Sequence, residues 1–166
     1  MKTSQPSLRP ATPHDTPRIA EIADATGLFP PEMLDDMIAG YFDGSKDDLW
    51  FVAESSEPPG VDASDGPIGF GFCEPERMTD GTWNLLAIGV LPARQSAGIG
   101  AAMMRHLEDT LRARGARVLI VETMGTDEFA RTRAFYRRNG YVEEARIREF
   151  YEPGGDKVVF WKHLVD

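Results

Sequence analysis

Residues 90–102 read VLPARQSAGIGAA, and they join an apolar strand pattern to the best helical pattern of the chain. Pro92 ends the strand, small residues follow, and the helix begins near Gly98. The first turn of a helix has backbone N–H groups without intrahelical partners, and the helix dipole adds to their attraction for an anion. Gly98 and Gly100 have no side chain that would keep a phosphate away. The stretch therefore predicts a phosphate-binding loop.

Spacing rules separate the known kinds of phosphate loop. A P-loop ends in Gly-Lys-Ser/Thr, and this triplet does not occur in the chain. A dinucleotide loop reads Gly-x-Gly-x-x-Gly, but Met103 stands where the third glycine would be. Glu122 meets that loop's demand for a later acidic residue, so a nucleotide-dependent oxidoreductase stays open. A tight turn whose glycines serve packing alone also stays open, because a lone glycine motif is weak evidence.

Periodicity on both sides of this loop predicts a mixture of helices and strands. Helical spacing of apolar residues predicts helices over 12–26, 31–42, 98–114 and 129–139. Alternation and apolar runs predict strands over 7–9, 49–54, 68–73, 83–90, 118–121, 141–151 and 157–163. Residues 55–66 are rich in Ser, Glu, Pro and Gly and predict a loop. This order indicates an α/β or α+β sheet with helices on both faces.

Length and charge narrow the class of protein. The chain has 166 residues, which is the size of one domain, and a formal net charge of -9. An acidic protein repels phosphates on average, so no nucleic-acid partner is expected; the charge suits a cationic amine, and equally suits solubility alone. Cys73 is the one cysteine, which fits a reducing compartment. We expect a cytoplasmic protein without a membrane segment, and no histidine has the spacing of a metal ligand.

Three stretches together resemble one family. The first is Gln95-x-x-Gly98-x-Gly100 after Val90-x-Pro92. The second is Phe135-Tyr136, three residues, then Gly140-Tyr141, and the third is the opening 8–12 followed by Asp15. These stretches resemble the GNAT superfamily of N-acetyltransferases. The resemblance implies a single domain over 1–166, with a mixed, mostly antiparallel sheet of about seven strands and about four helices on its two faces.

The resemblance also implies a reaction, the direct transfer of the acetyl group of acetyl-CoA to a primary amine of a small molecule or peptide. Tyr136 would protonate the departing thiolate, and Glu122 would be the base that deprotonates the amine. The asparagine that family members carry before the last helix is not evident near Phe129. The residues expected to hold the coenzyme are Ile88, Gly89, Val90, Gln95, Ser96, Ala97, Gly98, Ile99, Gly100 and Ala101.

The acceptor side is less defined by sequence. In the family this pocket is built by the first two helices and the last two strands. The resemblance therefore implies that Phe29, Met33, Trp83 and Tyr151 contact the acceptor amine, and it allows a homodimer. The identity of the amine stays open, because fold does not fix function. A non-catalytic acetyl-CoA sensor is the alternative that the same residues permit.

Overall fold

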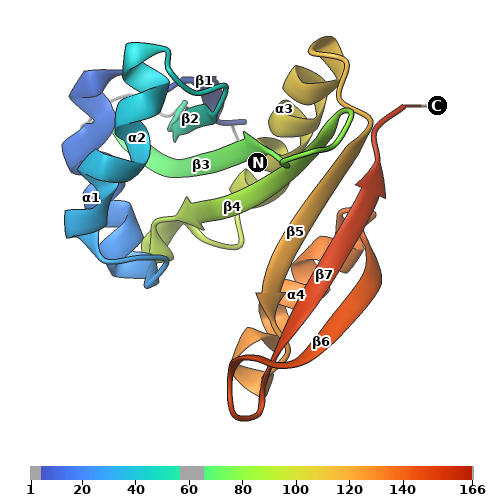
Figure 1. The fold of residues 1–166 in the computed structure, drawn as a ribbon. Coiled ribbons are helices and arrows are strands. Elements are labelled where there is room, and N and C mark those ends of the chain that lie inside the picture. Colours follow the sequence, from blue (N-terminus) through green and yellow to red (C-terminus); the bar gives the residue numbers. More distant parts are fainter. Residues whose placement is uncertain (1–4, 57–65, 166) are drawn as a thin grey trace. The chain divides into compact units, whose positions relative to one another are not determined.

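A computed structural model describes residues 5–56 and 66–165 (Figure 1). The four helices are α1 (Thr16–Thr26), α2 (Leu34–Asp43), α3 (Ile99–Ala113) and α4 (Ala130–Arg138). The seven strands are β1 (Ser7–Pro10), β2 (Leu49–Glu54), β3 (Pro67–Pro75), β4 (Thr82–Val90), β5 (Val118–Met124), β6 (Val142–Glu152) and β7 (Gly155–His163). Every predicted helix and strand is found. Most of the loop predicted over 55–66 lies outside the described residues.

The strands form a sheet in the order β1-β2-β3-β4-β5-β7-β6. β4 and β5 pair in parallel, from Thr82 with Val118 to Leu85 with Val121. β1 with β2, β2 with β3, β5 with β7, and β6 with β7 are antiparallel. Parallel neighbours need a crossover, and α3 supplies it. The predicted mixed, mostly antiparallel sheet is therefore confirmed. No helix among residues 5–56 and 66–165 is long and apolar enough to cross a membrane.

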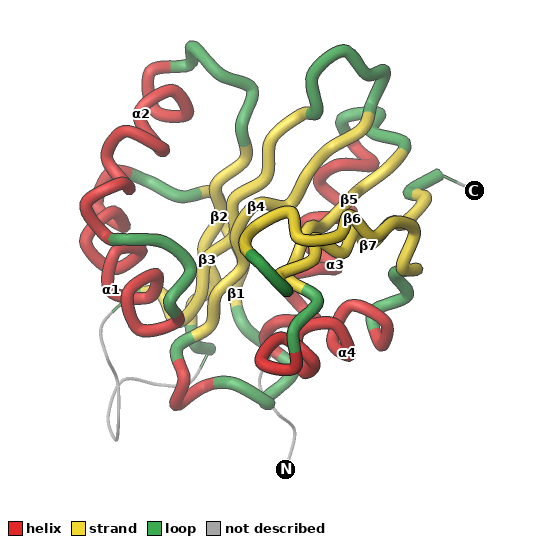
Figure 2. The backbone as a smooth tube through the Cα atoms, turned by 60° about the horizontal axis from the view of Figure 1, so that its bottom comes forward, coloured by secondary structure: helices red, strands yellow, loops and turns green. Residues whose placement is uncertain are grey.

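The chain divides into two compact units, which are described separately. The first unit holds Met1–Glu74 and Ala87–His106, and the second holds Pro75–Leu86 and Leu107–Asp166. β4 and α3 therefore each contribute one part to each unit. Figure 2 shows β1, β2 and β3 of the first unit side by side.

Helices cover both faces of the strands in the first unit. On one face Trp50 and Phe72 stack with ring centroids 4.1 Å apart, and α1 and α2 pack over them. On the other face α3 is close enough for the His106 ring to lie 5.4 Å from that of Phe51. The buried core of the first face consists of Ala11, Ile19, Ile22, Ala23, Leu34, Ile38, Trp50, Val52, Phe70, Phe72 and Ala87.

Glycines make the second face of β3 shallow. A Cβ on Gly69 would lie 3.0 Å from the sulfur of Met103 on α3, and one on Gly71 would collide with the ring of Phe51. The alternation of Gly69 and Gly71 with apolar residues predicts such a close approach, and the structure confirms it. Gly69 therefore allows β3 to lie close to the helix that begins at the predicted phosphate loop, and Gly71 leaves room for the Phe51 ring.

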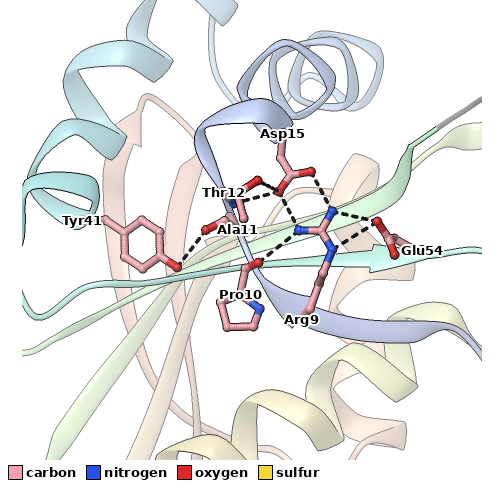
Figure 3. A network of polar contacts seen from close by, with 7 residues as sticks. All are labelled: Arg9, Pro10, Ala11, Thr12, Asp15, Tyr41 and Glu54. Carbon is pink, nitrogen blue, oxygen red and sulfur yellow. Dashed lines mark hydrogen bonds and ion pairs between the residues drawn. The ribbon is translucent and has the colours of Figure 1, made fainter.

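A charged network fixes the start of α1 (Figure 3). The Arg9 guanidinium donates two hydrogen bonds to the Asp15 carboxylate, at 2.7 and 2.8 Å, and two to Glu54, at 2.7 and 3.1 Å. Asp15 also accepts from the Thr12 N–H at 2.8 Å, the reach-back bond that the Thr12 to Asp15 spacing predicts. A 3₁₀ turn, Pro13–Asp15, precedes α1, so the helix begins at Thr16. The network ties β1, β2 and the first helix together.

Replacing Asp15 by Asn should weaken the dependence of the unfolding free energy on pH in the acid range. Its hydrogen bonds with Arg9 lower the Asp15 pKa from 3.8 to about 2. A lowered folded-state pKa stabilises the protein above pH 3.8, and this contribution disappears as the pH falls from there towards 2. We expect Asp15→Asn to cost about 1–2 kcal/mol near neutral pH and less at acid pH. Urea unfolding at several pH values measures this.

Asp24→Asn is the matched control, because Asp24 is an exposed carboxylate on the same helix. Its unfolding free energy should follow that of the native chain at every pH. If the profiles of the Asp15→Asn variant and the native chain stay parallel down to acid pH, the Arg9 network does not carry this stability.

Candidate functional site

The loop between β4 and α3 has an unusual backbone. Ser96 and Gly98 have positive φ angles, of 67° and 79°. Gln95 anchors the loop, because its side-chain amide donates to the carbonyl of Val90 at 3.0 Å. Leu91 directly follows β4, and its N–H donates to the carbonyl of Ile68 in β3 at 2.9 Å. The loop is thus held at its strand side by one side-chain bond and one backbone bond.

Helix α3 presents its first N–H groups beside this loop. Its first backbone bond runs from the Ala102 N–H to the Gly98 carbonyl, at 3.1 Å. The N–H groups of Ile99, Gly100 and Ala101 therefore have no carbonyl one turn earlier. Residues 95–98 are exposed, and a Cβ on Gly98 would have nothing within 4 Å. Gly98 is needed here for its left-handed backbone and for access rather than for packing.

The last residues of β4 are packed tightly in the first unit. A Cβ on Gly89 would lie 2.8 Å from Leu28 Cδ1 and 3.3 Å from the Thr26 hydroxyl, so α1 approaches the bare backbone of the strand. Val90 is buried, and Ile88 is half-buried. Pairing of β4 with β5 stops at Leu85. The strand therefore continues to Val90 beyond the part that pairs with β5.

Tyr136 belongs to the second unit and lies on α4. It is 4 % exposed, and its ring lies 5.5 Å from Phe160 and 5.9 Å from Tyr141. Burial raises the pKa of Tyr136 well above its usual value, so the phenol stays protonated at physiological pH. Aromatic neighbours thus fix the ring of a neutral proton donor.

A buried charged network lies behind Tyr141. Glu108 of α3 is 4 % exposed, and it accepts from the Tyr141 hydroxyl at 2.9 Å and from the Lys162 ammonium at 3.0 Å. Lys162 also donates to the Asn139 carbonyl at the end of α4, at 2.9 Å. The network joins α3, α4 and β7 within the second unit. It therefore fixes the helix that carries Tyr136.

Glu122 lies inside β5, not at its end, because the strand runs three residues past Val121 to Met124. Its carboxylate forms an ion pair of 2.9 Å with Lys157 of β7. Glu122 is opposite Val159 in the register, whereas Phe160, which contacts Tyr136, points to the other side of the sheet. The two predicted catalytic residues are therefore on opposite faces, and a shared reacting group would have to lie at a strand edge.

A bulge in β6 brings Tyr151 near Glu122. Partial burial raises the Tyr151 pKa, and the negative charge of Glu122 raises it further, whereas the Lys157 ammonium opposes this shift. The rings of Phe150 and Tyr151 lie 5.0 Å apart at 87°, and the Lys157 ammonium lies 4.3 Å from the Phe150 ring centroid. A shallow hollow of about 790 Å³ borders the bulge; its lining consists of Arg146, Ile147, Arg148, Glu149, Gly154 and Asp156.

Comparison with known proteins decides the family. A family model described as an acetyltransferase (GNAT) domain matches residues 46–143, which is more than half of the chain. The chain belongs to the GNAT acetyltransferase family. Membership makes this GNAT protein an enzyme of the acyltransferase class. No curated protein sequence matches it.

Solved structures share the fold over nearly the whole GNAT chain. A GNAT-family protein from Desulfovibrio desulfuricans is 28 % identical with a TM-score of 0.82, covering 96 % of this chain and 99 % of that one. The ribosomal-protein-S18-alanine N-acetyltransferase of Escherichia coli is 19 % identical with a TM-score of 0.75, covering 98 % and 96 %. A Salmonella typhimurium protein solved with acetyl-CoA is 20 % identical with a TM-score of 0.76, covering 98 % and 96 %. The predicted fold class is confirmed.

The structure groups only some of the predicted site residues of this GNAT domain. The expected coenzyme residues, 88–90 and 95–101, all belong to the first unit, where the Gln95 side chain bonds to the Val90 carbonyl, and Glu122 lies near Tyr151 in the second. Trp83 is opposite Leu119, on the face turned away from Glu122, and it is buried under the Arg114 guanidinium. In the first unit Phe29 packs against Phe70, and Met33 is 49 % exposed.

The sequence reading missed Lys157, Phe150 and Glu108. Lys157 is the first residue of the predicted strand 157–163, and only the register of β5 with β7 shows that it lies on the same strand face as Glu122. Glu108 sits in the apolar pattern of α3, where a lone acidic residue is a signal for a buried ion pair.

Removing either charge of the Glu108–Lys162 pair should destabilise the second unit. We expect Lys162→Met to cost about 2 kcal/mol, because it removes the nearer cation of a buried carboxylate and leaves only Arg112, at 3.7 Å. The double variant Glu108→Gln with Lys162→Met should cost less than the sum of the two single variants. Urea unfolding of the four proteins measures this coupling.

Glu143→Gln is the control, because it breaks the exposed pair with Arg137 at 2.8 Å. It should cost less than about 1 kcal/mol. Additive single costs for Glu108 and Lys162 would contradict a shared network.

Proposed function

We propose that this GNAT domain transfers the acetyl group of acetyl-CoA to a primary amine of a small molecule or peptide. The observation that carries the proposal is the exposed loop with positive φ angles at Ser96 and Gly98, which directly precedes α3. The chain that carries this loop belongs to an acetyltransferase family. Relatives of this fold are solved with coenzyme A or acetyl-CoA. Bound acetyl-CoA supplies a thioester, whose acetyl carbon accepts the amine.

In this proposal, residues of the first unit bind the coenzyme. The backbone N–H groups from Ser96 to Ala101 hold the pyrophosphate, because the helix start offers unpaired donors and a positive dipole end. The backbone of Ile88 and Val90 pairs with the pantetheine arm as an added strand would. Two observations support this fit. No atom lies within 4 Å of the position of a Cβ on Gly98, so a ligand can approach its backbone, and the pairing of β4 with β5 ends at Leu85, before Ile88.

In this proposal Tyr136 donates a hydrogen bond to the departing sulfur. A thiol is ordinarily more acidic than a phenol, and burial widens this difference because it raises the Tyr136 pKa. Complete transfer of the phenolic proton is therefore unfavourable in the resting protein. A hydrogen bond that strengthens as negative charge grows on sulfur is the contribution a buried neutral phenol can make.

Glu122 is the proposed base that takes the proton of the acceptor ammonium. The ion pair with Lys157 orients its carboxylate across the strands. The same pair also occupies the carboxylate that the reaction needs. Turnover of a primary amine would contradict the alternative, a non-catalytic acetyl-CoA sensor.

Gly98→Glu should abolish binding of acetyl-CoA, because the new carboxylate would block and repel the pyrophosphate. Calorimetry on the native chain and the variant measures this, and we expect at least a hundredfold loss of affinity.

Gly115→Glu is a matched control at the other end of the same helix. Gly98 and Gly115 both have a φ of 79°, and a Cβ would have nothing within 4 Å at either position. The two variants therefore share the backbone strain and the added charge. Equal loss of affinity in both variants, or no binding to the native chain, would contradict the site.

Tyr136→Phe should lower kcat by about a hundredfold and change the affinity for acetyl-CoA little, because only the hydrogen bond to the departing sulfur is lost. Release of coenzyme A, followed with a thiol reagent, gives the rate. Tyr41→Phe is the control: it removes a phenol that donates to the Ala11 carbonyl at 3.1 Å in the first unit. Full activity of the Tyr136→Phe variant would remove Tyr136 from the mechanism.

A further inference from the structure

The Glu122–Lys157 pair lies on one face of the sheet, across β5 and β7. Lys157 lies opposite Met124 in the register, and Glu122 lies opposite Val159, so the two side chains meet diagonally across β5 and β7. Lys157 is 14 % exposed and Glu122 is 27 % exposed. We call the surface formed by Glu122, Lys157, Phe150 and Tyr151 the Glu122 face. Its centre holds one negative and one positive group 2.9 Å apart.

A strained bulge builds the aromatic part of this face. Between the pairs Ile147 with Lys157 and Glu152 with Gly155, four residues of β6 stand opposite Asp156 alone. Glu149, in the middle, has a φ of 53°, which is uncommon for a residue with a side chain. Bulges often aim side chains at a functional site, and local strain is kept there when the surroundings enforce it.

Asp156 enforces the bulge. One oxygen of its carboxylate accepts from the Glu149 N–H at 2.9 Å, and the other accepts from the Arg146 guanidinium at 3.0 Å. Its own carbonyl accepts from the Gly125 N–H at the end of β5, at 2.9 Å. Phe150 and Tyr151 follow Glu149 directly. They remain 52 % and 43 % exposed, although Lys157 packs over the Phe150 ring.

The charges of the Glu122 face select the chemistry of an acceptor. A purely cationic amine that approached Glu122 would meet the Lys157 ammonium at the same place and be repelled. An acceptor with a carboxylate next to its amine satisfies both groups at once, because each half of the Glu122–Lys157 pair receives a new partner of opposite charge. The exposed rings of Phe150 and Tyr151 favour a large apolar side chain beside these charges.

We propose that the acceptor is a zwitterionic α-amino acid with a large apolar side chain. Its ammonium pairs with Glu122, its carboxylate pairs with Lys157, and its side chain packs on Phe150 and Tyr151. The inference rests on the proposed acetyl transfer and names the substrate class for it. In the reaction Glu122 takes one ammonium proton. The nitrogen then forms a bond to the acetyl carbon as the carbon–sulfur bond breaks, and the thiolate leaves with the electron pair. The new amide nitrogen loses its second proton, which the thiolate takes up, and Glu122 returns the first proton to water.

The test compares acceptors that differ only in the carboxylate. Leucine, methionine and phenylalanine are each assayed with acetyl-CoA beside their amides and their decarboxylated amines, and release of coenzyme A gives kcat/KM. The free amino acid should exceed its amide and its amine by tenfold or more, since a charge-assisted hydrogen bond is lost in both analogues. Lys157→Met should remove this preference, so that the ratio of amino acid to amide approaches one.

Arg138→Met is the matched control, because it removes one exposed positive charge from α4 of the same unit and should keep the native ratio. Thermal unfolding checks that both variants are folded. Amides or amines used as well as amino acids, an unchanged ratio in Lys157→Met, or no turnover of any amino acid by a chain that binds acetyl-CoA would overturn the inference. Failure to bind acetyl-CoA at all would instead overturn the proposed function, and acetylation of another amine would leave that function standing.

Discussion

The parallel pairing of β4 with β5 is the constraint from which the site follows. Two parallel neighbours cannot be joined by a tight turn, so the chain must return along the sheet, and it does so through α3. The helix therefore has to begin just after β4 ends, and its unpaired N–H groups face the loop that leaves the strand. Gly98, with its positive φ, makes that reversal possible in a few residues. The proposed phosphate site at this point would therefore be a consequence of topology, to which the loop sequence adds access.

The arrangement also explains which parts of the molecule the sequence could predict. Helices and strands follow from local apolar periodicity, and the loop before α3 follows from glycine spacing, so both were predictable. Gly69 and Gly71 even predicted the close approach of a neighbouring element, because alternate glycines leave one strand face empty. These features depend on residues that are close in the chain.

Features that depend on strand register could not be predicted in the same way. Glu122 and Lys157 are 35 positions apart in the numbering, and only the pairing of β5 with β7 makes them neighbours. The bulge had a misleading signal as well. Glu152 to Asp156 reads as a five-residue turn, whereas Glu152 pairs with Gly155 and the irregular part lies earlier, around Glu149. Asp156 decides this, because its carboxylate binds the Glu149 N–H.

Charge has to be judged at the scale of the site rather than of the whole chain. A net charge of -9 attracts cationic ligands at long range, and for this reason the sequence favours a cationic amine as the acceptor. Salt screens such a field within about 10 Å, whereas partly buried groups in contact are screened much less. The Lys157 ammonium, held between Glu122 and the Phe150 ring, is therefore the stronger influence on an amine that reaches Glu122. The overall acidity would steer a cation to the protein. In the proposed reaction, the Glu122–Lys157 pair would determine whether that cation also needs a carboxylate of its own.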